Sequence, residues 1–271
     1  MKKIITYSTI ALTTLLLTAG CSNNKAHPAK AENHHTKHWG YLGDVAPAHW
    51  SKLDEKFYMC AEGKQQSPIN VVANTADKLL PALDIQYIKA SKSVAHHTHT
   101  GHTQELNNGH TVEVEVEAGN IFNVDGESYE LKQFHFHTPS ENHVDGKSYP
   151  LEAHFVHATK EGKLAVIAVM FKEGKEHPTL KKIWSKFPMK VNKELDIKFN
   201  SDDLNSMMPE DESYYRFKGS LTTPPCTEDV KWFVLKTPLT VSKAEIEAIN
   251  KELGHANNRP IQATNKREID G

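Results

Sequence analysis

Alternation between apolar and polar residues constrains the fold of this chain more than any other feature. Residues 111–117 read Thr-Val-Glu-Val-Glu-Val-Glu, and residues 131–137 alternate again. Successive side chains of a strand point to opposite faces, so a period of two predicts strands with one apolar face. Turn-forming residues at 123–128 lie between further strand-like runs.

Other segments extend this pattern into one sheet. Residues 164–171 are almost continuously apolar, which predicts a strand in the interior of a sheet. The chain shows no sustained βαβ alternation and no internal repeat. We therefore expect a mainly β (α+β) fold, a single domain built on a large sheet with a few short helices. The remaining predicted strands are residues 151–158, 214–217 and 230–235.

Helical patterns are scarce. One short candidate covers residues 179–186, and a clearer one covers residues 242–253. In the second, Ser242 is the expected N-cap, Glu245 stands at the capping-box position, and Gly254 follows the end.

Composition narrows the function. The 271 residues are 38% hydrophobic and 24% charged, which is typical of a soluble globular protein. A net charge of -2 gives no basic field for a phosphate backbone, so we expect no nucleic-acid partner. The 17 histidines direct attention to metal binding or proton transfer, because histidine is the commonest metal ligand and titrates near neutral pH.

The first 20 residues have the properties of an export signal. Met1-Lys2-Lys3 is positively charged, and residues 4–17 are apolar apart from Thr, Tyr and Ser. That stretch is short for a permanent membrane span but suits a signal peptide. Small residues then precede Cys21, as in a bacterial lipoprotein, although Thr18 stands where Leu is usual. We expect residues 1–20 to be removed and Cys21 to be lipidated.

A second cleavage site, after Ala31, stays open. Either cleavage predicts an extracytoplasmic protein, in the periplasm or at the cell surface, with a membrane anchor only if Cys21 carries lipid. Residues 21–37 are polar and predict a flexible tether before the folded domain at 38–271. Its histidines, with His38, could hold metal weakly, but a solvated linker is the favoured interpretation.

Two cysteines remain after Cys21, namely Cys60 and Cys226. In an exported protein this number favours one disulfide, with buried free thiols as the alternative.

Histidine spacing predicts a metal site. His135 and His137 are two residues apart on a predicted strand, so they share one face, and Phe134 and Phe136 share the other. His154, on a later predicted strand, could supply a third imidazole. Three neutral imidazoles with one open position form a catalytic zinc arrangement. One such pair alone is weak evidence, because most are surface or hydrogen-bonded histidines.

Two further residues support this interpretation. Gln133 and Glu152 each precede a proposed ligand by two residues, and could accept hydrogen bonds from the rings of His135 and His154.

Eight short motifs follow one another along residues 38–271. They are His38-Trp39-Gly40-Tyr41, Gln65-Gln66-Ser67-Pro68-Ile69-Asn70, Leu106-Asn107-Asn108-Gly109-His110, Gln133-Phe134-His135-Phe136-His137, Pro139-Ser140-Glu141-Asn142-His143, Leu151-Glu152-Ala153-His154, Gly219-Ser220-Leu221-Thr222-Thr223-Pro224-Pro225-Cys226 and Asn257-Asn258-Arg259-Pro260. In sequence and in order they resemble the α-class carbonic anhydrases, specifically their bacterial branch. The resemblance implies a large twisted, mostly antiparallel sheet with zinc in a conical cleft.

The resemblance implies zinc-dependent, reversible hydration of carbon dioxide to bicarbonate and a proton, by attack of zinc-bound hydroxide. Carbonic anhydrases are the standard example of zinc lowering the pKa of a bound water, to about 7. Sulfonamides and small anions would inhibit at the zinc. Bacterial members are often dimers, which leaves a homodimer open, since the sequence itself shows no interface.

The resemblance also assigns roles to residues. Thr222 accepts a hydrogen bond from the hydroxide and donates one to Glu141, and Thr223 touches bicarbonate. His110 is the proton shuttle. A wall for carbon dioxide is formed by Val156, Val166, Leu221, Val230 and Trp232. Supporting roles fall to Tyr41 and Asn108, which order water, to the Asn257 carbonyl, which orients His137, and to a Cys60–Cys226 disulfide.

Two features depart from the family or stay unexplained. Thr138-Pro139 follow the second ligand, where animal members have Trp. The His-rich run at 96–102 predicts an exposed loop that could bind metal weakly, with a solvated loop favoured. The competing functions are a non-enzymatic extracytoplasmic zinc-binding lipoprotein and a different zinc hydrolase, such as an esterase.

Overall fold

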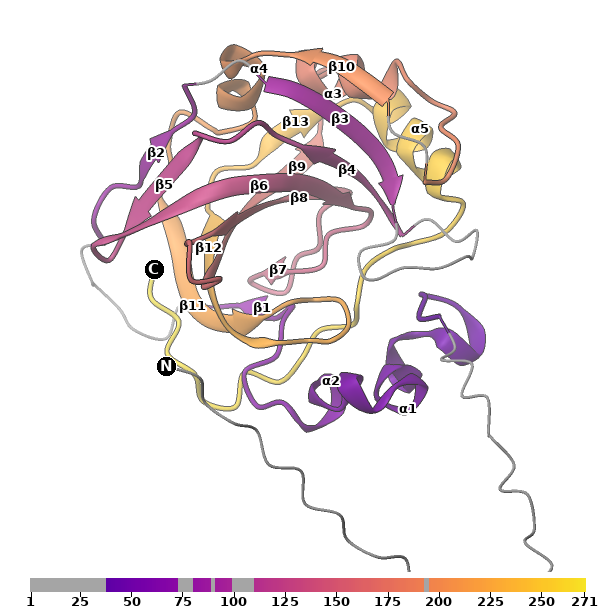
Figure 1. Cartoon of the computed structure of the whole chain (residues 1–271), viewed down its shortest axis with the longest axis vertical. Coiled ribbons are helices and arrows are strands. Elements are labelled where there is room, and N and C mark those ends of the chain that lie inside the picture. Colours follow the sequence, from indigo (N-terminus) through magenta and orange to yellow (C-terminus); the bar gives the residue numbers. More distant parts are fainter. Residues whose placement is uncertain (1–37, 73–79, 89–90, 99–109, 193–194) are drawn as a thin grey trace, which may run out of the picture. The chain divides into compact units, whose positions relative to one another are not determined.

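The predicted strands, together with others, form one 11-stranded sheet in the described part of the chain (Figure 1). The computed structural model describes residues 38–72, 80–88, 91–98, 110–192 and 195–271, which all belong to one unit, residues 36–271. The strands are β2 (Asp84–Gln86), β3 (Ser91–Thr98), β4 (Thr111–Glu115), β5 (Ile121–Val124), β6 (Glu127–His137), β8 (Leu151–Ala158), β9 (Leu164–Glu173), β10 (Leu195–Phe199), β11 (Tyr214–Ser220), β12 (Glu228–Leu235) and β13 (Leu239–Val241).

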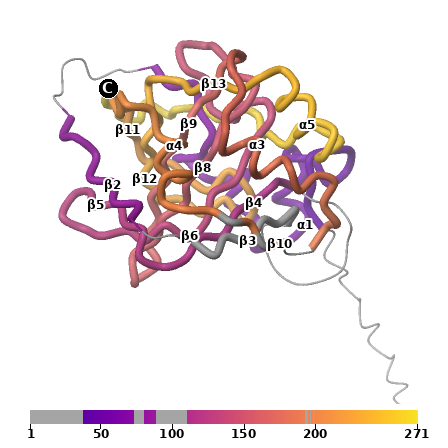
Figure 2. Tube along the Cα trace, turned by 90° about the horizontal axis from the view of Figure 1, so that it is seen from above, coloured from indigo at the N-terminus to yellow at the C-terminus, as the bar shows by residue number. Residues whose placement is uncertain are grey.

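Along the sheet the order is β10-β3-β4-β6-β8-β9-β12-β11, with β5 beside β6, β2 beside β5 and β13 beside β9. Figure 2 shows the same sheet from above, where β12 lies near β9 and β11. Pairings are antiparallel except those of β12 and β13 with β9. A separate parallel pair joins β1 (Asn70–Val71) to β7 (His143–Val144). The predicted fold class, mainly β with a mostly antiparallel sheet, is confirmed.

The predicted strands are present with small changes of extent. The segment 111–117 ends as a strand at Glu115, whereas 151–158 is reproduced as β8. The apolar strand β9 lies inside the sheet between β8 and β12, as its composition predicts.

The alternation at residues 131–137 is interrupted, which sequence reasoning did not predict. The register of β6 against β8 shifts between Leu131 and Gln133. Such a bulge adds one residue to a strand and reverses the parity of its faces. Tyr129 and Leu131 therefore point into the hydrophobic core before the bulge, and Phe134 and Phe136 do so after it. Without this shift the histidines at 135 and 137 would face the core.

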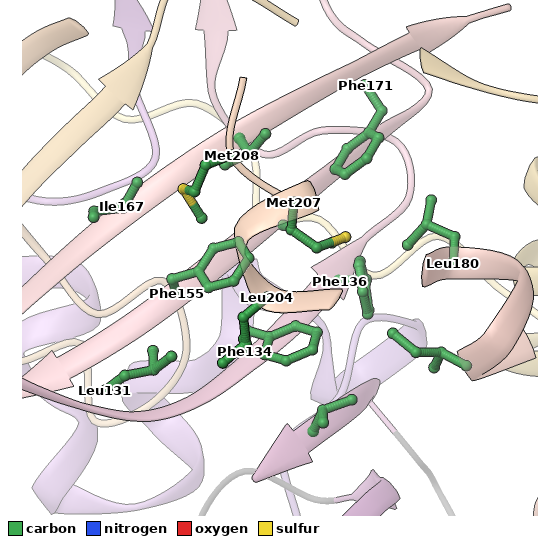
Figure 3. Close-up of a cluster of buried hydrophobic side chains, with 14 of the residues drawn as sticks. Leu131, Phe134, Phe136, Phe155, Ile167, Phe171, Leu180, Leu204, Met207 and Met208 are labelled. Atoms are coloured by element: carbon green, nitrogen blue, oxygen red, sulfur yellow. The ribbon is translucent and has the colours of Figure 1, made fainter. Parts of the chain in front are cut away.

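The hydrophobic core packs the sheet against helices. Phe134 and Phe155 stack with ring centroids 5.1 Å apart and belong to the same buried cluster as Leu204 and Met207. Figure 3 shows these side chains meeting between the strands and the short helices. This face of the sheet is filled with apolar side chains, apart from His157, whose ring lies against Phe122 and Tyr87. The three histidines proposed as ligands are left to the opposite face.

Both predicted helices exist, as α3 (Pro178–Trp184) and α5 (Lys243–Leu253). Helix α5 begins with a capping box: the Ser242 hydroxyl accepts from Glu245 N, and the Glu245 carboxylate accepts from Ser242 N. Gly254 ends it in the left-handed conformation, φ 74°. The other helices are η1 (Gly43–Val45), η2 (Pro47–His49), α1 (Trp50–Leu53), η3 (Glu55–Phe57), α2 (Met59–Glu62) and α4 (Ser201–Ser206).

None of the helices in the described part of the chain has the length and apolar character needed to span a bilayer.

Candidate metal centre

Three histidines meet on the polar face of β6 and β8. His135 and His137 alternate along β6, and His154 lies directly opposite His135 in the β6–β8 register. All three side chains are buried, and one ring nitrogen from each lies within 4.8 Å of the other two. The sheet therefore brings together the three residues that the sequence proposed as ligands.

Each ring has its second nitrogen bound to a fixed acceptor. His135 Nδ1 donates to Gln133 Oε1, and His137 Nδ1 donates to the Asn257 carbonyl, both at 2.8 Å. Because an oxygen with no hydrogen can only accept, these nitrogens carry the ring protons. The Nε2 atoms of His135 and His137 are left with lone pairs.

His154 is oriented the other way round. Its Nε2 donates to Glu152 Oε1 at 2.8 Å, so its Nδ1 carries the lone pair. Burial lowers the pKa of His135 and His154 well below the usual histidine value, and it lowers that of His137 as well. The three rings are thus neutral and matched to a cation.

One observation tests whether a metal suits this site. His137 Nε2 is a buried atom without a hydrogen-bond partner among the described residues. An unsatisfied buried nitrogen costs free energy unless a ligand completes it. Three such lone pairs from imidazoles are the donor set of zinc, copper, iron or nickel sites.

The Glu152 carboxylate organises a second part of the site. Besides His154, it accepts from the backbone of Glu141 at 2.7 Å and from both the backbone and the amide of Asn142, at 2.9 and 2.7 Å. One buried carboxylate thereby fixes a ring of the histidine cluster and the segment that carries Glu141.

Glu141 itself points toward the histidines. Its Oε1 accepts from Arg259 N at 2.8 Å, and its Oε2 lies 3.4 Å from His137 Nε2. Burial raises the pKa of Glu141 to about 8, while hydrogen bonds from the Arg259 backbone and the Thr222 side chain act in the opposite direction. Thr222, in the loop after β11, is buried. The pair named from the resemblance is therefore in contact, and Thr223 is the next residue.

Asn257 joins the histidines to the segment that precedes β4. Its carbonyl accepts from His137, and its side-chain amide donates to the carbonyls of His110 and Phe136, at 2.8 and 2.9 Å. The side chain of His110 is also buried, and its ring stacks on Trp39 with a centroid distance of 3.8 Å. Tyr41 meets the same ring edge-on at 5.8 Å.

The proposed apolar wall is one cluster on the face that holds the histidines. Val156 follows His154 by two residues and pairs across the sheet with Val166, which pairs with Trp232. The Trp232 ring lies 4.9 Å from the His154 ring. Leu221 and Val230 pack into the same cluster.

Cys60 and Cys226 form a disulfide that joins residues 166 positions apart in the sequence. The structure therefore excludes the alternative of free buried thiols. The Cys60 carbonyl accepts from the Arg259 side chain, and the Cys226 carbonyl accepts from Gln66.

Some predictions lie outside the described residues. These are the signal peptide, the lipidated Cys21, the tether and Asn108. The loop expected at residues 96–102 is wrong for its first part, because residues 96–98 belong to β3 and pair with β4. The rest of the run, from residue 99, lies outside the described residues.

Comparison with known proteins decides the family. Residues 45–270 match the model of the eukaryotic-type carbonic anhydrases. The chain belongs to this family. A carbonic anhydrase of Pectobacterium carotovorum is 44% identical over 232 residues, which is 86% of this chain and 90% of that one. A carbonic anhydrase of Neisseria gonorrhoeae is 41% identical over 260 residues, 95% of either chain.

Solved structures of carbonic anhydrases agree with this assignment. The α-carbonic anhydrase of Thermovibrio ammonificans, solved with the inhibitor sulfanilamide, superposes with a TM-score of 0.77 at 41% identity, covering 86% of this chain and 99% of that one. The enzyme of Photobacterium profundum superposes with a TM-score of 0.74 at 43% identity, covering 86% and 100%. The expected relation to the bacterial α-class enzymes is confirmed. Family membership favours an enzyme over a non-enzymatic metal carrier.

Sequence reasoning missed two contributors to the carbonic anhydrase site. Trp39 supplies the stacking surface for His110, and Arg259 supplies the backbone amide that holds Glu141. Both lie in motifs quoted for the resemblance. Their contacts join residues far apart in the chain, and no local spacing signals such a contact.

Proposed function

We propose that this carbonic anhydrase carries out zinc-dependent, reversible hydration of carbon dioxide to bicarbonate and a proton, with His135, His137 and His154 as the zinc ligands. The supporting observation is the convergence of three neutral, buried imidazoles whose outward nitrogens are already bonded. A zinc ion held by three histidines lowers the pKa of water to about 7 and so supplies a nucleophile at neutral pH, the effect for which carbonic anhydrases are the standard example.

Thr222 and Glu141 would orient the attacking oxygen. The Thr222 hydroxyl has one hydrogen, and donation of that hydrogen to Glu141 leaves its oxygen free to accept from the nucleophile. This direction requires an ionised Glu141, which the Arg259 backbone amide supports and burial opposes. Fixing the direction of one lone pair is a contribution from orientation.

Carbon dioxide is apolar, and the cluster of Val156, Val166 and Trp232 offers an apolar surface beside His154. Leu221 and Val230 flank the Thr222 loop and extend that surface. Thr223 would contact the bicarbonate product. His110 would accept the proton that hydration releases, because a neutral imidazole offers one ring nitrogen with a lone pair to take it up.

An extracytoplasmic location completes the proposal. The disulfide between Cys60 and Cys226 suits an oxidising compartment, and the first 20 residues read as an export signal. We infer a periplasmic or surface enzyme with residues 38–271 as its catalytic domain, tethered by residues 21–37 to lipid on Cys21 if cleavage precedes that residue.

The decisive experiment combines zinc content with stopped-flow hydration of carbon dioxide. We expect one zinc per chain, rapid hydration, and inhibition by sulfanilamide, which the Thermovibrio ammonificans relative binds. A fully zinc-loaded protein that did not hydrate carbon dioxide would overturn the proposed activity and favour a metal-binding role.

A further inference from the structure

The side chain of His110 is shielded from solvent, although a proton shuttle must deliver its proton to buffer. Only 1% of His110 is exposed. Trp39 covers its ring at a centroid distance of 3.8 Å and an interplanar angle of 14°. A buffer molecule needs direct access to a ring nitrogen or a connecting hydrogen-bonded group in order to take the proton. The structure must therefore provide a second group between His110 and the surface.

His38 occupies that place. It is partly exposed, and its Nε2 lies 3.0 Å from His110 Nε2. The two rings are 15° from parallel. Two imidazole nitrogens at this distance form a hydrogen bond only if one carries a hydrogen and the other a lone pair. The contact is thus a direct path for a proton from a buried ring to a solvent-accessible one.

The surroundings hold this geometry in place. Trp39, the neighbour of His38, packs edge-on against Trp50 at 5.3 Å. The Trp50 indole N–H donates to the carbonyls of Gly40 and Val45, at 2.8 and 3.0 Å. These contacts anchor the backbone that carries His38.

His110, the other member of the pair, is held by Asn257. Asn257 donates to the His110 carbonyl and accepts from His137. Asn257 therefore connects the His110–His38 pair to the histidine cluster, through its side-chain amide on one side and its backbone carbonyl on the other.

We propose that His38 is a second proton carrier, which takes the proton from His110 and passes it to the buffer. This rests on the shuttle role proposed for His110. The protonated His110 loses the hydrogen on Nε2 as a new N–H bond forms on Nε2 of His38, and the positive charge moves with it. A buffer base then removes a proton from His38. Both rings end neutral, and one proton has passed from the site to the buffer.

His255 provides a matched control. It is partly exposed like His38, and its ring lies 5.9 Å from that of Tyr41, so it belongs to the same neighbourhood. Its Nδ1 lies 3.0 Å from the carbonyl of Ala256, the next residue, and no contact joins it to His110 in the described part of the chain. Loss of His255 removes an imidazole of similar exposure without removing the bond to His110.

The test uses the zinc-loaded enzyme at saturating carbon dioxide in a weak buffer. His38→Ala should lower kcat by about tenfold, less than the hundredfold typical of removing a general acid or base, because His110 still accepts the proton. Its kcat/KM and zinc content should not change, and added imidazole should restore kcat. His255→Ala should match the parent. Unchanged kcat in His38→Ala, or an equal loss in His255→Ala, would overturn the relay.

Further variants separate this inference from the shuttle itself. His110→Ala should lower kcat at least as much as His38→Ala, and the double variant should match His110→Ala, because the two groups act in series. A loss in His110→Ala with none in His38→Ala would refute the relay and leave the shuttle intact. No loss in His110→Ala would refute both.

Nitrogen NMR gives a reading that does not depend on turnover. With ¹⁵N-labelled histidine, the Nε2 signal of His110 should move on substitution of His38 by Ala and stay in place on substitution of His255. An unmoved His110 signal in His38→Ala would show that the bond is absent in solution and overturn the relay.

Discussion

The two ends of strand β6 carry polar clusters of opposite character. At its start, Glu127 belongs to an exposed ion-pair network, and at its end, His137 belongs to a buried cluster in which most polar atoms have an assigned partner. The surface network links Asp125 and Glu127 to Lys163, Arg216 and Lys231.

The surface network is redundant, whereas the buried cluster is not. Lys231 contacts both Asp125 and Glu127, and solvent can replace any lost partner. In the buried cluster, Glu152 alone accepts four hydrogen bonds from three residues. If one buried group is removed, its hydrogen-bond partners have no water or other side chain to replace it. Single substitutions in the buried cluster should therefore change stability and metal binding far more than substitutions in the surface network.

The largest expected effect is on the free energy of unfolding, which should depend on pH through His157, a buried histidine of β8. Burial lowers the pKa of His157 to about 3. Above pH 6.5 the ring is neutral in both the folded and unfolded states, and as pH falls from 6.5 toward 3 only the unfolded state gains the proton. The free energy of unfolding should therefore fall by up to about 5 kcal/mol over that range.

Denaturant unfolding of the parent and of His157→Gln at pH 7 and pH 4 would measure this effect. The variant should be less stable at pH 7, because the Tyr87 hydroxyl loses its 2.8 Å partner, but should lose less stability on acidification. Equal acid sensitivity in both proteins would contradict the assignment to His157.

Removal of one proposed ligand comes next. His154→Ala should weaken zinc binding by about 3–4 kcal/mol, or several hundredfold, since the affinity of about 10–16 kcal/mol for structural zinc sites is shared among their ligands. Competition with a chelator measures this loss. His143→Ala, on β7, is the control and should bind zinc like the parent. Comparable affinities in both variants would exclude His154 as a ligand.

Glu152→Gln should have an intermediate effect. The amide group of Gln cannot accept hydrogen bonds with both of its heavy atoms, so either His154 or the backbone of residues 141–142 loses its acceptor. Zinc affinity should fall by about 10- to 100-fold, as is typical when a group that orients a ligand is changed. Chelator competition again gives the value, and affinity within twofold of the parent would refute this role of Glu152.

The smallest effect should follow the same change at the exposed end of β6. Glu127→Gln removes a carboxyl group whose pKa is lowered to about 2, chiefly by the hydrogen bond from Lys163. Because this carboxylate is exposed, Tm should fall by at most about 3 °C, with zinc affinity unaltered. A Tm loss as large as that of Glu152→Gln would remove the contrast between the two ends.

Sequence predicted the elements with strong local patterns. Alternation located β4 and the second half of β6, and β-rich composition located β8. Continuous apolarity located β9, and the capping residues located α5. The strand β3 was missed, because its sequence Ser-Lys-Ser-Val-Ala-His-His-Thr has no clear period, and its pairing with β4 and β10 is a tertiary interaction.

The candidate site divides in the same way. Spacing alone proposed His135, His137 and His154, whereas Glu141 and Thr222 were found only through the family resemblance. The stacking of Trp39 on His110 and the register shift before Gln133 had no local signal. Both depend on partners contributed by other strands and loops, which a linear pattern does not contain.

The Asn257 carbonyl and the Arg259 amide come late in the chain, although they hold His137 and Glu141. At a synthesis rate of about 5–20 residues per second, Arg259 leaves the ribosome's catalytic centre roughly 5–20 seconds after His154. When the residues of β8 have been synthesised, the nascent chain thus still lacks the two backbone groups that hold His137 and Glu141. Maturation to a competent enzyme therefore has to wait until residues 257–259 have been synthesised.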